Sequence, residues 1–146
     1  MKNKGFSLVE LIIVIAIMVI LAGTLAPMLI KYIGKSRLSK DVDTGASIGR
    51  AIMAAVTNDN VFEDAVEQST PKDVNDMQGP EFKEEVFKAM GVDYLEGESK
   101  VDINNDPVDK KFYYTLDAAR NRVEVYYGGT SQDYLVFPNT GSKMNK

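Results

Sequence analysis

The strongest constraint on this chain is an uncharged apolar run near its start. The twenty residues from Leu11 to Ile30, LIIVIAIMVILAGTLAPMLI, carry no charged side chain. At a helical rise of about 1.5 Å per residue the run is roughly 30 Å long, which matches the hydrocarbon core of a bilayer. The sequence therefore predicts one membrane-spanning helix near the amino terminus.

A single acid, Glu10, stands at the edge of this run, five residues after Gly5. On insertion scales a carboxylate deep in a membrane span costs about 2 to 3 kcal/mol, so such an acid normally has a partner or a function. A short leader that contains Lys2 and Lys4 precedes the helix. The leader and the acid together indicate more than a plain hydrophobic anchor.

The residues from Gly5 to Glu10, with the sequence GFSLVE, and the apolar helix after them resemble the signature of type IV pilins. The resemblance implies that a membrane-embedded prepilin peptidase cleaves between Gly5 and Phe6. It also implies methylation of the new terminus, which makes Phe6 an N-methylphenylalanine. Gly5 has no side chain, so the backbone is open to a protease, and the leader lysines favour a cytoplasmic position.

The resemblance further implies that Glu10 of an assembling subunit neutralises the Phe6 amine of a neighbouring subunit. Such a buried pair adds little net stability, but deleting one partner leaves the other charge in apolar surroundings. We therefore expect the pair to set the register between subunits.

Other interpretations of the amino terminus stay open. In an ordinary secretory signal, cleavage would follow Ala26, although Pro27 directly after it restricts the backbone. In a plain signal anchor, Glu10 would have no partner. Four cations follow the span, namely Lys31, Lys35, Arg37 and Lys40. Charge counting alone therefore does not place the leader in the cytoplasm, and the pilin resemblance decides the orientation.

Composition excludes several classes of function. The 146 residues contain no cysteine and no histidine, which removes disulfides, thiolate metal sites, the commonest zinc ligand and the commonest general base near neutral pH. The net charge of −4 becomes −6 when Lys2 and Lys4 leave with the leader, so a nucleic-acid partner is not predicted. No motif brings two catalytic groups together, and we expect no enzymatic activity.

The helix is expected to continue past the span, from about residue 6 to about residue 56. Apolar and small residues recur in its second half at steps of three and four, the period of one helix face. They are Leu38, Val42, Ala46, Gly49, Ile52 or Met53, and Val56. This amphipathic half is predicted to lie across a sheet, and Gly34, Gly45 and Gly49 either weaken the helix or permit close approach.

A weak point is predicted in the first half of the helix, at Gly23 and Pro27. Pro27 lacks an amide proton and its ring presses on the carbonyl of Gly23. One interpretation is a simple kink that the Thr24 hydroxyl relieves. The pilin resemblance implies instead that the stretch loosens when subunits leave the bilayer and enter a filament.

The remaining chain is predicted to form a globular head. The expected divisions are a leader at 1–5, an assembly helix at 6–30, its amphipathic continuation at 31–57 and the head at 58–146. Within the head, residues 58–79 are a polar connection with a short helix at about 62–68, and a second helix covers about 80–90. Strands are predicted at 111–116, 122–127 and 134–137, and they form an antiparallel meander whose aromatic residues pack in the core.

One loop has the spacing of a calcium-binding segment. Asp102, Asn104 and Asp106 place oxygen-bearing side chains at alternate positions, as the opening of an EF-hand loop does. Pro107 then stands where that loop needs glycine, and Tyr113 where it needs glutamate. The Asp-Pro followed by aromatic residues also resembles the calcium loop of major pseudopilins, without its tryptophan and glycine. We therefore expect a solvated turn, with no metal or other cofactor, and keep calcium as the alternative.

The sequence thus predicts an α+β protein with the pilin fold, in which a long helix packs on a small antiparallel sheet. The expected function is that of a type IV pilus subunit, held in the cell membrane and then polymerised into an extracellular filament. Its expected partners are like subunits, the prepilin peptidase, and the assembly ATPase with its membrane platform. The alternatives are a pseudopilin of type II secretion or competence DNA uptake, and a signal-anchored extracellular binding module.

Overall fold

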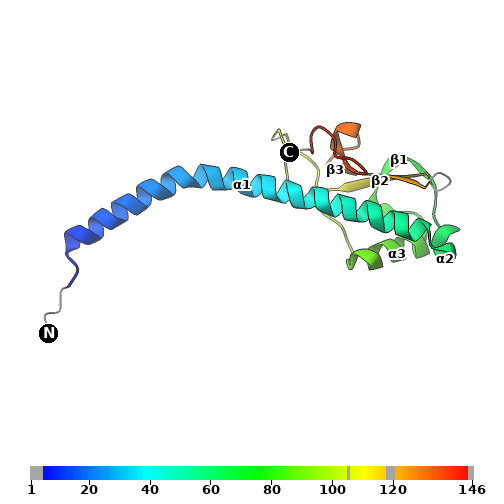
Figure 1. Ribbon diagram of the computed structural model, residues 1–146, viewed down its shortest axis with the longest axis horizontal. Coiled ribbons are helices and arrows are strands. Elements are labelled where there is room, and N and C mark those ends of the chain that lie inside the picture. Colours follow the sequence, from blue (N-terminus) through cyan, green and yellow to red (C-terminus); the bar gives the residue numbers. More distant parts are fainter. Residues whose placement is uncertain (1–4, 105, 118–120, 145–146) are drawn as a thin grey trace. The chain divides into compact units, whose positions relative to one another are not determined.

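The computed structural model describes residues 5–104, 106–117 and 121–144 of the chain (Figure 1). It contains two compact units, residues 1–34 and residues 35–146. Helix α1 covers Leu8–Val56 and so belongs to both units. The long helix predicted for about residues 6 to 56 is therefore confirmed, with its start two residues later because the chain from Gly5 to Ser7 is not helical.

The first unit exposes its apolar side chains. Every large apolar residue from Phe6 to Ile33 keeps at least 43% of its surface accessible, the lowest value being that of Val14. The amino-terminal part of α1 is also long and apolar enough to cross a membrane. In water this surface would be strongly unfavourable, so the helix requires an apolar environment supplied by something other than its own chain.

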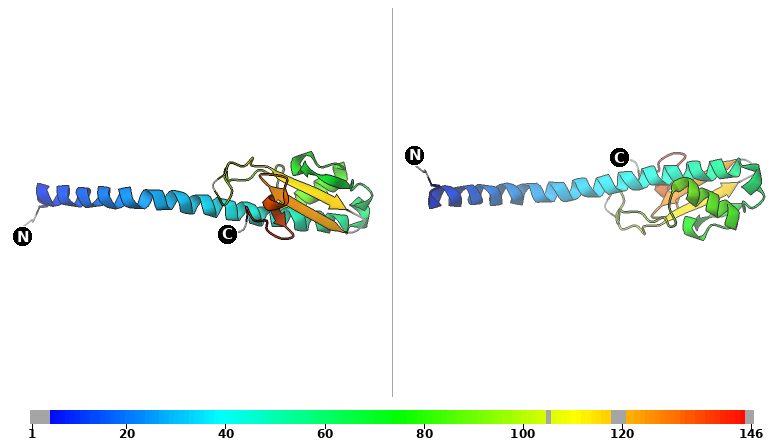
Figure 2. Two further views of the ribbon diagram at one scale, coloured as in Figure 1. Left: turned by 90° about the horizontal axis from the view of Figure 1, so that it is seen from above. Right: turned by 90° about the horizontal axis from the view of Figure 1, so that it is seen from below.

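The second unit, residues 35–146, is α+β. We call this unit the head from here on, and it includes the amphipathic half of α1 in addition to the predicted head at 58–146. Its elements after α1 are α2 (Asp59–Phe62), β1 (Gln68–Asp73), α3 (Pro80–Met90), β2 (Phe112–Asp117), β3 (Arg122–Tyr127) and β4 (Leu135–Phe137), with short 3₁₀ turns η1 (Val74–Asp76) and η3 (Gln132–Tyr134). The strands form one antiparallel sheet in the order β1-β2-β3-β4. Figures 1 and 2 show the sheet and α3 around the part of α1 that belongs to the head.

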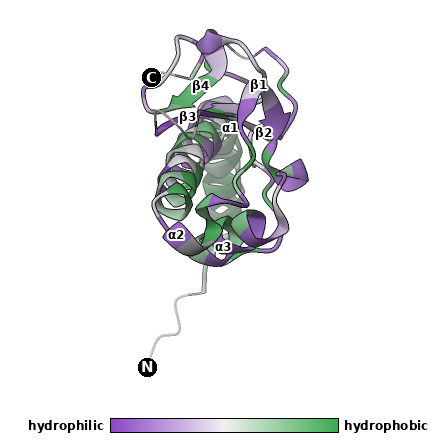
Figure 3. Ribbon diagram, turned by 90° about the vertical axis from the view of Figure 1, so that its right-hand side faces the viewer, coloured by the Kyte–Doolittle hydropathy of each residue, from purple (hydrophilic) through white to green (hydrophobic). Residues whose placement is uncertain are grey.

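Two predictions for the polar connection were wrong. The short helix expected at 62–68 is absent, since α2 begins earlier and ends at Phe62. The segment Gln68–Asp73, which was assigned no regular structure, forms strand β1. The segment is polar and contains Pro71, so its sequence does not indicate a strand. Proline has no amide proton and is tolerated only where one side of a strand is unpaired. Strand β1 lies at the sheet edge, and it is largely hydrophilic in Figure 3, whereas β4 is apolar.

The core lies between the sheet and α1. Residues of β2 alternate in burial, β3 ends with three consecutive buried residues, Val125, Tyr126 and Tyr127, and three cross-strand pairs face the core. These pairs are Phe112 with Tyr127, Tyr114 with Val125, and Leu116 with Val123. The rings of Phe112 and Tyr127 are 4.9 Å apart between centroids. The prediction that the aromatic residues serve as packing is therefore confirmed.

The buried face of α1 includes four of the predicted positions, Leu38, Gly49, Ile52 and Val56. Val42, Ala46 and Met53 are half-buried, and Asp41, Gly45 and Ile48 are buried instead. The face is thus rotated slightly from the predicted stripe.

Two glycines of α1 allow strand β4 to approach the helix. A Cβ atom added at Gly45 would lie 2.3 Å from Cγ2 of Val136, and one added at Gly49 would lie 2.3 Å from Cδ1 of Phe137. Real Cβ atoms do not approach carbon atoms this closely. The close-approach explanation therefore holds for Gly45 and Gly49, whereas the space around Gly34 is open within 4 Å.

Replacing Gly49 with alanine should destabilise the head although alanine is the better helix former. Alanine gains about 1 kcal/mol in helix propensity, but forcing a methyl group into the Phe137 ring costs about 1–3 kcal/mol. We expect a lower melting temperature for the tyrosine near-ultraviolet circular dichroism signal of the full chain in detergent. Gly34→Ala, which meets open space, should show no loss. Equal stability of the two variants would contradict the packing argument.

Candidate assembly and processing site

Helix α1 begins with a capping box. Ser7 is the residue before the helix, and its hydroxyl oxygen accepts a hydrogen bond from the Val9 amide at 3.3 Å. In return, Oε2 of Glu10 accepts a hydrogen bond from the Ser7 amide at 2.9 Å. This reciprocal arrangement satisfies amide groups that the first turn leaves without partners. The Ser-x-x-Glu spacing of Ser7 and Glu10 is the sequence signal for this capping box.

The capping box places Glu10 beside the predicted cleavage site. Its carboxylate binds the amide of Ser7, and the nitrogen of Phe6 is one residue further toward the terminus. The residues Gly5 and Phe6 precede the helix, Phe6 is 88% exposed, and a side chain at Gly5 would meet no atom within 4 Å. The structure thus brings the three predicted residues together at an exposed, non-helical stretch before α1.

The predicted weak point lies inside α1, which the structure describes as helical through Pro27. The Thr24 hydroxyl donates a hydrogen bond to the carbonyl of Leu21 at 2.9 Å. It therefore does not serve the carbonyl of Gly23, which Pro27 cannot satisfy because it has no amide proton. Both interpretations of the weak point at Gly23 and Pro27, the simple kink and the loosening on assembly, stay predictions.

A second cluster holds the loop before β2 on the helix. Asp41 of α1 is 2% exposed. Its Oδ1 accepts a hydrogen bond from the Glu98 amide at 2.8 Å, and its Oδ2 accepts one from the Ser99 amide at 2.6 Å. The hydroxyl of Tyr127 donates to the Ser99 carbonyl at 2.6 Å. Lys40 pairs with the Glu98 carboxylate beside them.

This Asp41 cluster is structural. Burial, together with the charge of Asp41, raises the pKa of the Tyr127 hydroxyl above its ordinary value, so the tyrosine stays a neutral donor. A Cβ atom at Gly97 would lie 2.1 Å from the Tyr127 ring, so the loop is packed closely against it. The hydrogen bonds of Asp41 and Tyr127 therefore fix the loop on the helix and the sheet.

The calcium candidate forms a turn, as predicted, but its first acid is buried instead of solvated. Asp102 is buried, and its Oδ1 accepts hydrogen bonds from the amides of Asn104 at 2.8 Å and Asp106 at 3.0 Å. The side chain of Asn104 is exposed. Lys143 lies beside both carboxylates, with its Nζ 3.3 Å from Oδ2 of Asp102 and 3.1 Å from Oδ2 of Asp106. In the described ranges no three acidic residues gather in a way that would hold a metal.

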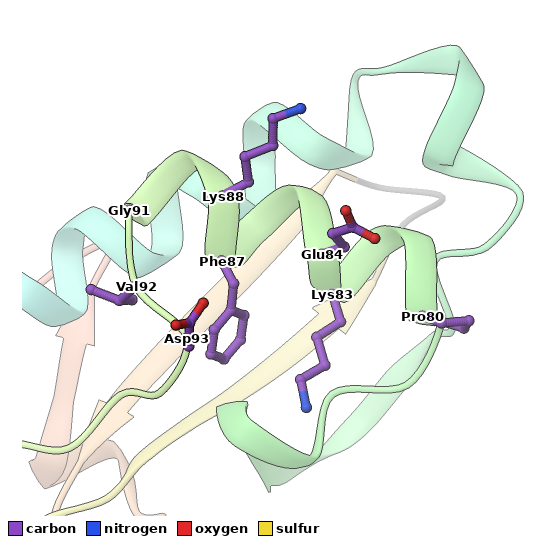
Figure 4. Close-up of a pocket in the computed structure, with 8 residues that line it drawn as sticks. All are labelled: Pro80, Lys83, Glu84, Phe87, Lys88, Gly91, Val92 and Asp93. Carbon is purple, nitrogen blue, oxygen red and sulfur yellow. The ribbon is translucent and has the colours of Figure 1, made fainter.

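A groove of about 640 Å³ runs along α3 and the turn after it (Figure 4). The figure shows Phe87 and Lys83 pointing to one side of α3 and Lys88 pointing away. The Lys83 ammonium lies 5.5 Å from the centre of the Phe87 ring. The lining also includes Glu84 and Asp93, and the prediction that this region carries no chemistry stays a prediction.

Comparison with known proteins bears on the amino terminus alone. No curated protein and no solved structure matches the chain. Residues 1–26 match the family model described as the prokaryotic N-terminal methylation motif. This range includes the exposed Gly5–Phe6 bond, the capping box and the first turns of the apolar helix. The chain therefore carries the methylation signal of type IV pilins and pseudopilins, the substrates of prepilin peptidase, on a protein with the α+β pilin fold.

Proposed function

We propose that this protein is a structural subunit of a type IV pilus. Prepilin peptidase removes residues 1–5 and methylates Phe6, α1 holds the subunit in the cell membrane, and the subunit then polymerises into an extracellular filament. A cytoplasmic assembly ATPase and its membrane platform drive this step. The protein has no catalytic role of its own. The observation that carries the proposal is a methylation motif that leads directly into an exposed apolar helix.

The exposed surface of α1 supports both stages of this proposal. Fully burying one large apolar side chain is worth about 1.5–3 kcal/mol, and every such side chain from Phe6 to Ile33 is at least 43% exposed. Lipid covers them in the monomer, and the helices of neighbouring subunits cover them in the filament. A single surface therefore serves first as membrane anchor and then as assembly interface.

The geometry of Glu10 supports its role in assembly. Oε2 binds the Ser7 amide, while Oε1 makes no hydrogen bond in the described part of the chain. Cleavage creates a positive amine at Phe6, and a carboxylate with one oxygen unused is suited to accept the amine of a neighbouring subunit. We propose that this intersubunit pair forms as each subunit enters the filament.

Replacing Gly5 with valine should block processing and leave the fold intact. The branched side chain crowds the peptide bond that the peptidase must reach, while the open space around Gly5 means that no contact within the protein is lost. Mass spectrometry of the membrane fraction should show wild-type protein cut before a methylated Phe6 and the variant with its leader. Gly34→Val, also in open space, is the control and should be processed normally. An uncut wild-type chain, or a cut after Ala26, would reject the proposal.

The methylation motif also occurs in pseudopilins, so a pseudopilin of type II secretion or DNA uptake is the second candidate. Genomic neighbours distinguish the two. A retraction ATPase with several pilin genes supports the pilus, and a secretin with secretion genes supports the pseudopilin. A signal-anchored binding module is excluded if Phe6 is methylated.

A further inference from the structure

The C-terminal segment, residues 141–144, is held on the rest of the head by backbone hydrogen bonds on two sides. The amide of Gly141 donates to the Leu135 carbonyl at 2.7 Å, and the amide of Lys143 donates to the Asp133 carbonyl at 3.0 Å. On the other side, the Ile103 amide donates to the carbonyl of Lys143 at 3.0 Å. The backbone of Lys143 is thus fixed between η3 and the loop that contains Asp102.

The side chain of Lys143 lies among three oxygen atoms. Its Nζ is 3.1 Å from Oδ2 of Asp106, 3.3 Å from the hydroxyl of Tyr134 and 3.3 Å from Oδ2 of Asp102. It also lies 5.3 Å from the centre of the Tyr134 ring. Hydrogen bonds to Asp106 and Tyr134 and the nearby carboxylate of Asp102 raise the pKa of the lysine above its ordinary value, so the group is a permanent cation at physiological pH.

Asp102 needs a cation at this position. Its side chain has no exposed surface, and Oδ2 is buried without a hydrogen-bond donor of good geometry. A buried carboxylate is strongly unfavourable unless an opposite charge lies close to it. Among the described residues, Lys143 is the only cation that lies within ion-pair distance of Asp102. Lys143 therefore supplies the positive charge that the buried Asp102 carboxylate needs.

We propose that the Lys143 ammonium occupies the position beside Asp102 and Asp106 that a bound metal ion would take. Through these contacts it holds the C-terminal segment on the head. The head consequently needs no divalent cation for its stability. Met144 follows Lys143 and is 1% exposed within the core, so the contacts of Lys143 also keep the Met144 side chain packed there. The proposal is independent of whether the protein forms pili or serves as a pseudopilin.

The test compares thermal unfolding of the full chain in detergent micelles, with a chelator and with millimolar calcium chloride. The near-ultraviolet circular dichroism of the tyrosines reports on the head. Wild-type protein should melt at the same temperature in both buffers. Lys143→Met keeps the apolar stem and removes the charge, and in chelator it should melt roughly 5 °C lower or more. Lys100→Met removes an exposed charge from the same loop region and is the matched control, with no such loss.

A second variant separates charge from packing. In Asp102→Asn combined with Lys143→Met, no buried charge remains, so this protein should melt higher than Lys143→Met alone in chelator. Calcium should raise the melting temperature of Lys143→Met, because the freed carboxylates accept it, and should not affect the double variant. The proposal is overturned if calcium stabilises the wild type, if Lys143→Met melts like the wild type, or if the double variant recovers nothing.

Discussion

Cells that carry Glu10→Gln should contain processed, methylated subunits in their membranes and almost no filaments. Glutamine retains a carbonyl oxygen that accepts the Ser7 hydrogen bond of the capping box, so the start of α1 is preserved. It has no negative charge for the Phe6 amine of a neighbour. A buried charge left without its partner costs about 3–5 kcal/mol, which lowers the assembly constant for each subunit more than tenfold, since about 1.4 kcal/mol is a factor of ten.

Two measurements on three variants check this result. Mass spectrometry of the membrane fraction should show normal processing, and the yield of sheared filaments should fall sharply. Glu10→Ala loses the cap as well as the charge, and a lost cap costs about 1 kcal/mol, so its filament yield should be no higher than that of Glu10→Gln. Ser7→Ala, which removes only the hydroxyl cap on Val9, should still form filaments. Wild-type filament yield from Glu10→Gln would contradict the proposed role of the acid.

Asp41→Ala should produce the largest loss of head stability among single substitutions considered. The change leaves the amides of Glu98 and Ser99 without their acceptors at 2.8 and 2.6 Å. The Ser99 amide is buried and the Glu98 amide is partly buried, and each buried donor left unsatisfied costs about 1–3 kcal/mol, so the free energy of unfolding should fall by about 2 kcal/mol or more. Urea unfolding of the full chain in detergent, followed by the tyrosine near-ultraviolet signal, measures it.

The same helix supplies the control for this prediction. Asp43 has the same charge and is exposed, so Asp43→Ala should change the free energy of unfolding by no more than about 0.5 kcal/mol. Asp41→Asn should lie between the two, because its amide oxygen can accept one of the two hydrogen bonds and its NH₂ group faces the other donor. Equal stability of Asp41→Ala and Asp43→Ala would show that the loop is held by other contacts.

The sequence predicted elements whose own side chains form a regular pattern. The apolar run and the three- and four-residue steps after it predicted α1, and the runs of aromatic and β-branched residues at 111–116 and 122–127, each bounded by turn residues, predicted β2 and β3. Strand β1 was missed because its stability comes from pairing with β2, through partners such as Gln68 and Leu116. A polar edge strand with a proline carries almost no local signal of its own.

The methylation motif could be recognised from the sequence because its residues lie within one short stretch of chain. Gly5, Phe6 and Glu10 form one short motif, and the capping box could also have been read from Ser7 and Glu10. The loop contacts were not predictable in this way. Asp41 and Ser99 are 58 positions apart, and Lys143 meets Asp106 across 37 positions. The one local hint was an acid, Asp41, next to the apolar stripe of an amphipathic helix.

The apolar surface of α1 has a consequence for the traffic of subunits. A stem with exposed side chains from Phe6 to Ile33 has no favourable state in free aqueous solution. Under the proposed function, a subunit that joins a growing fibre would move laterally from the lipid into the base of the fibre, without an intermediate that diffuses through water. By the same argument, a subunit released at that base would return to the lipid and stay available for the next round of growth.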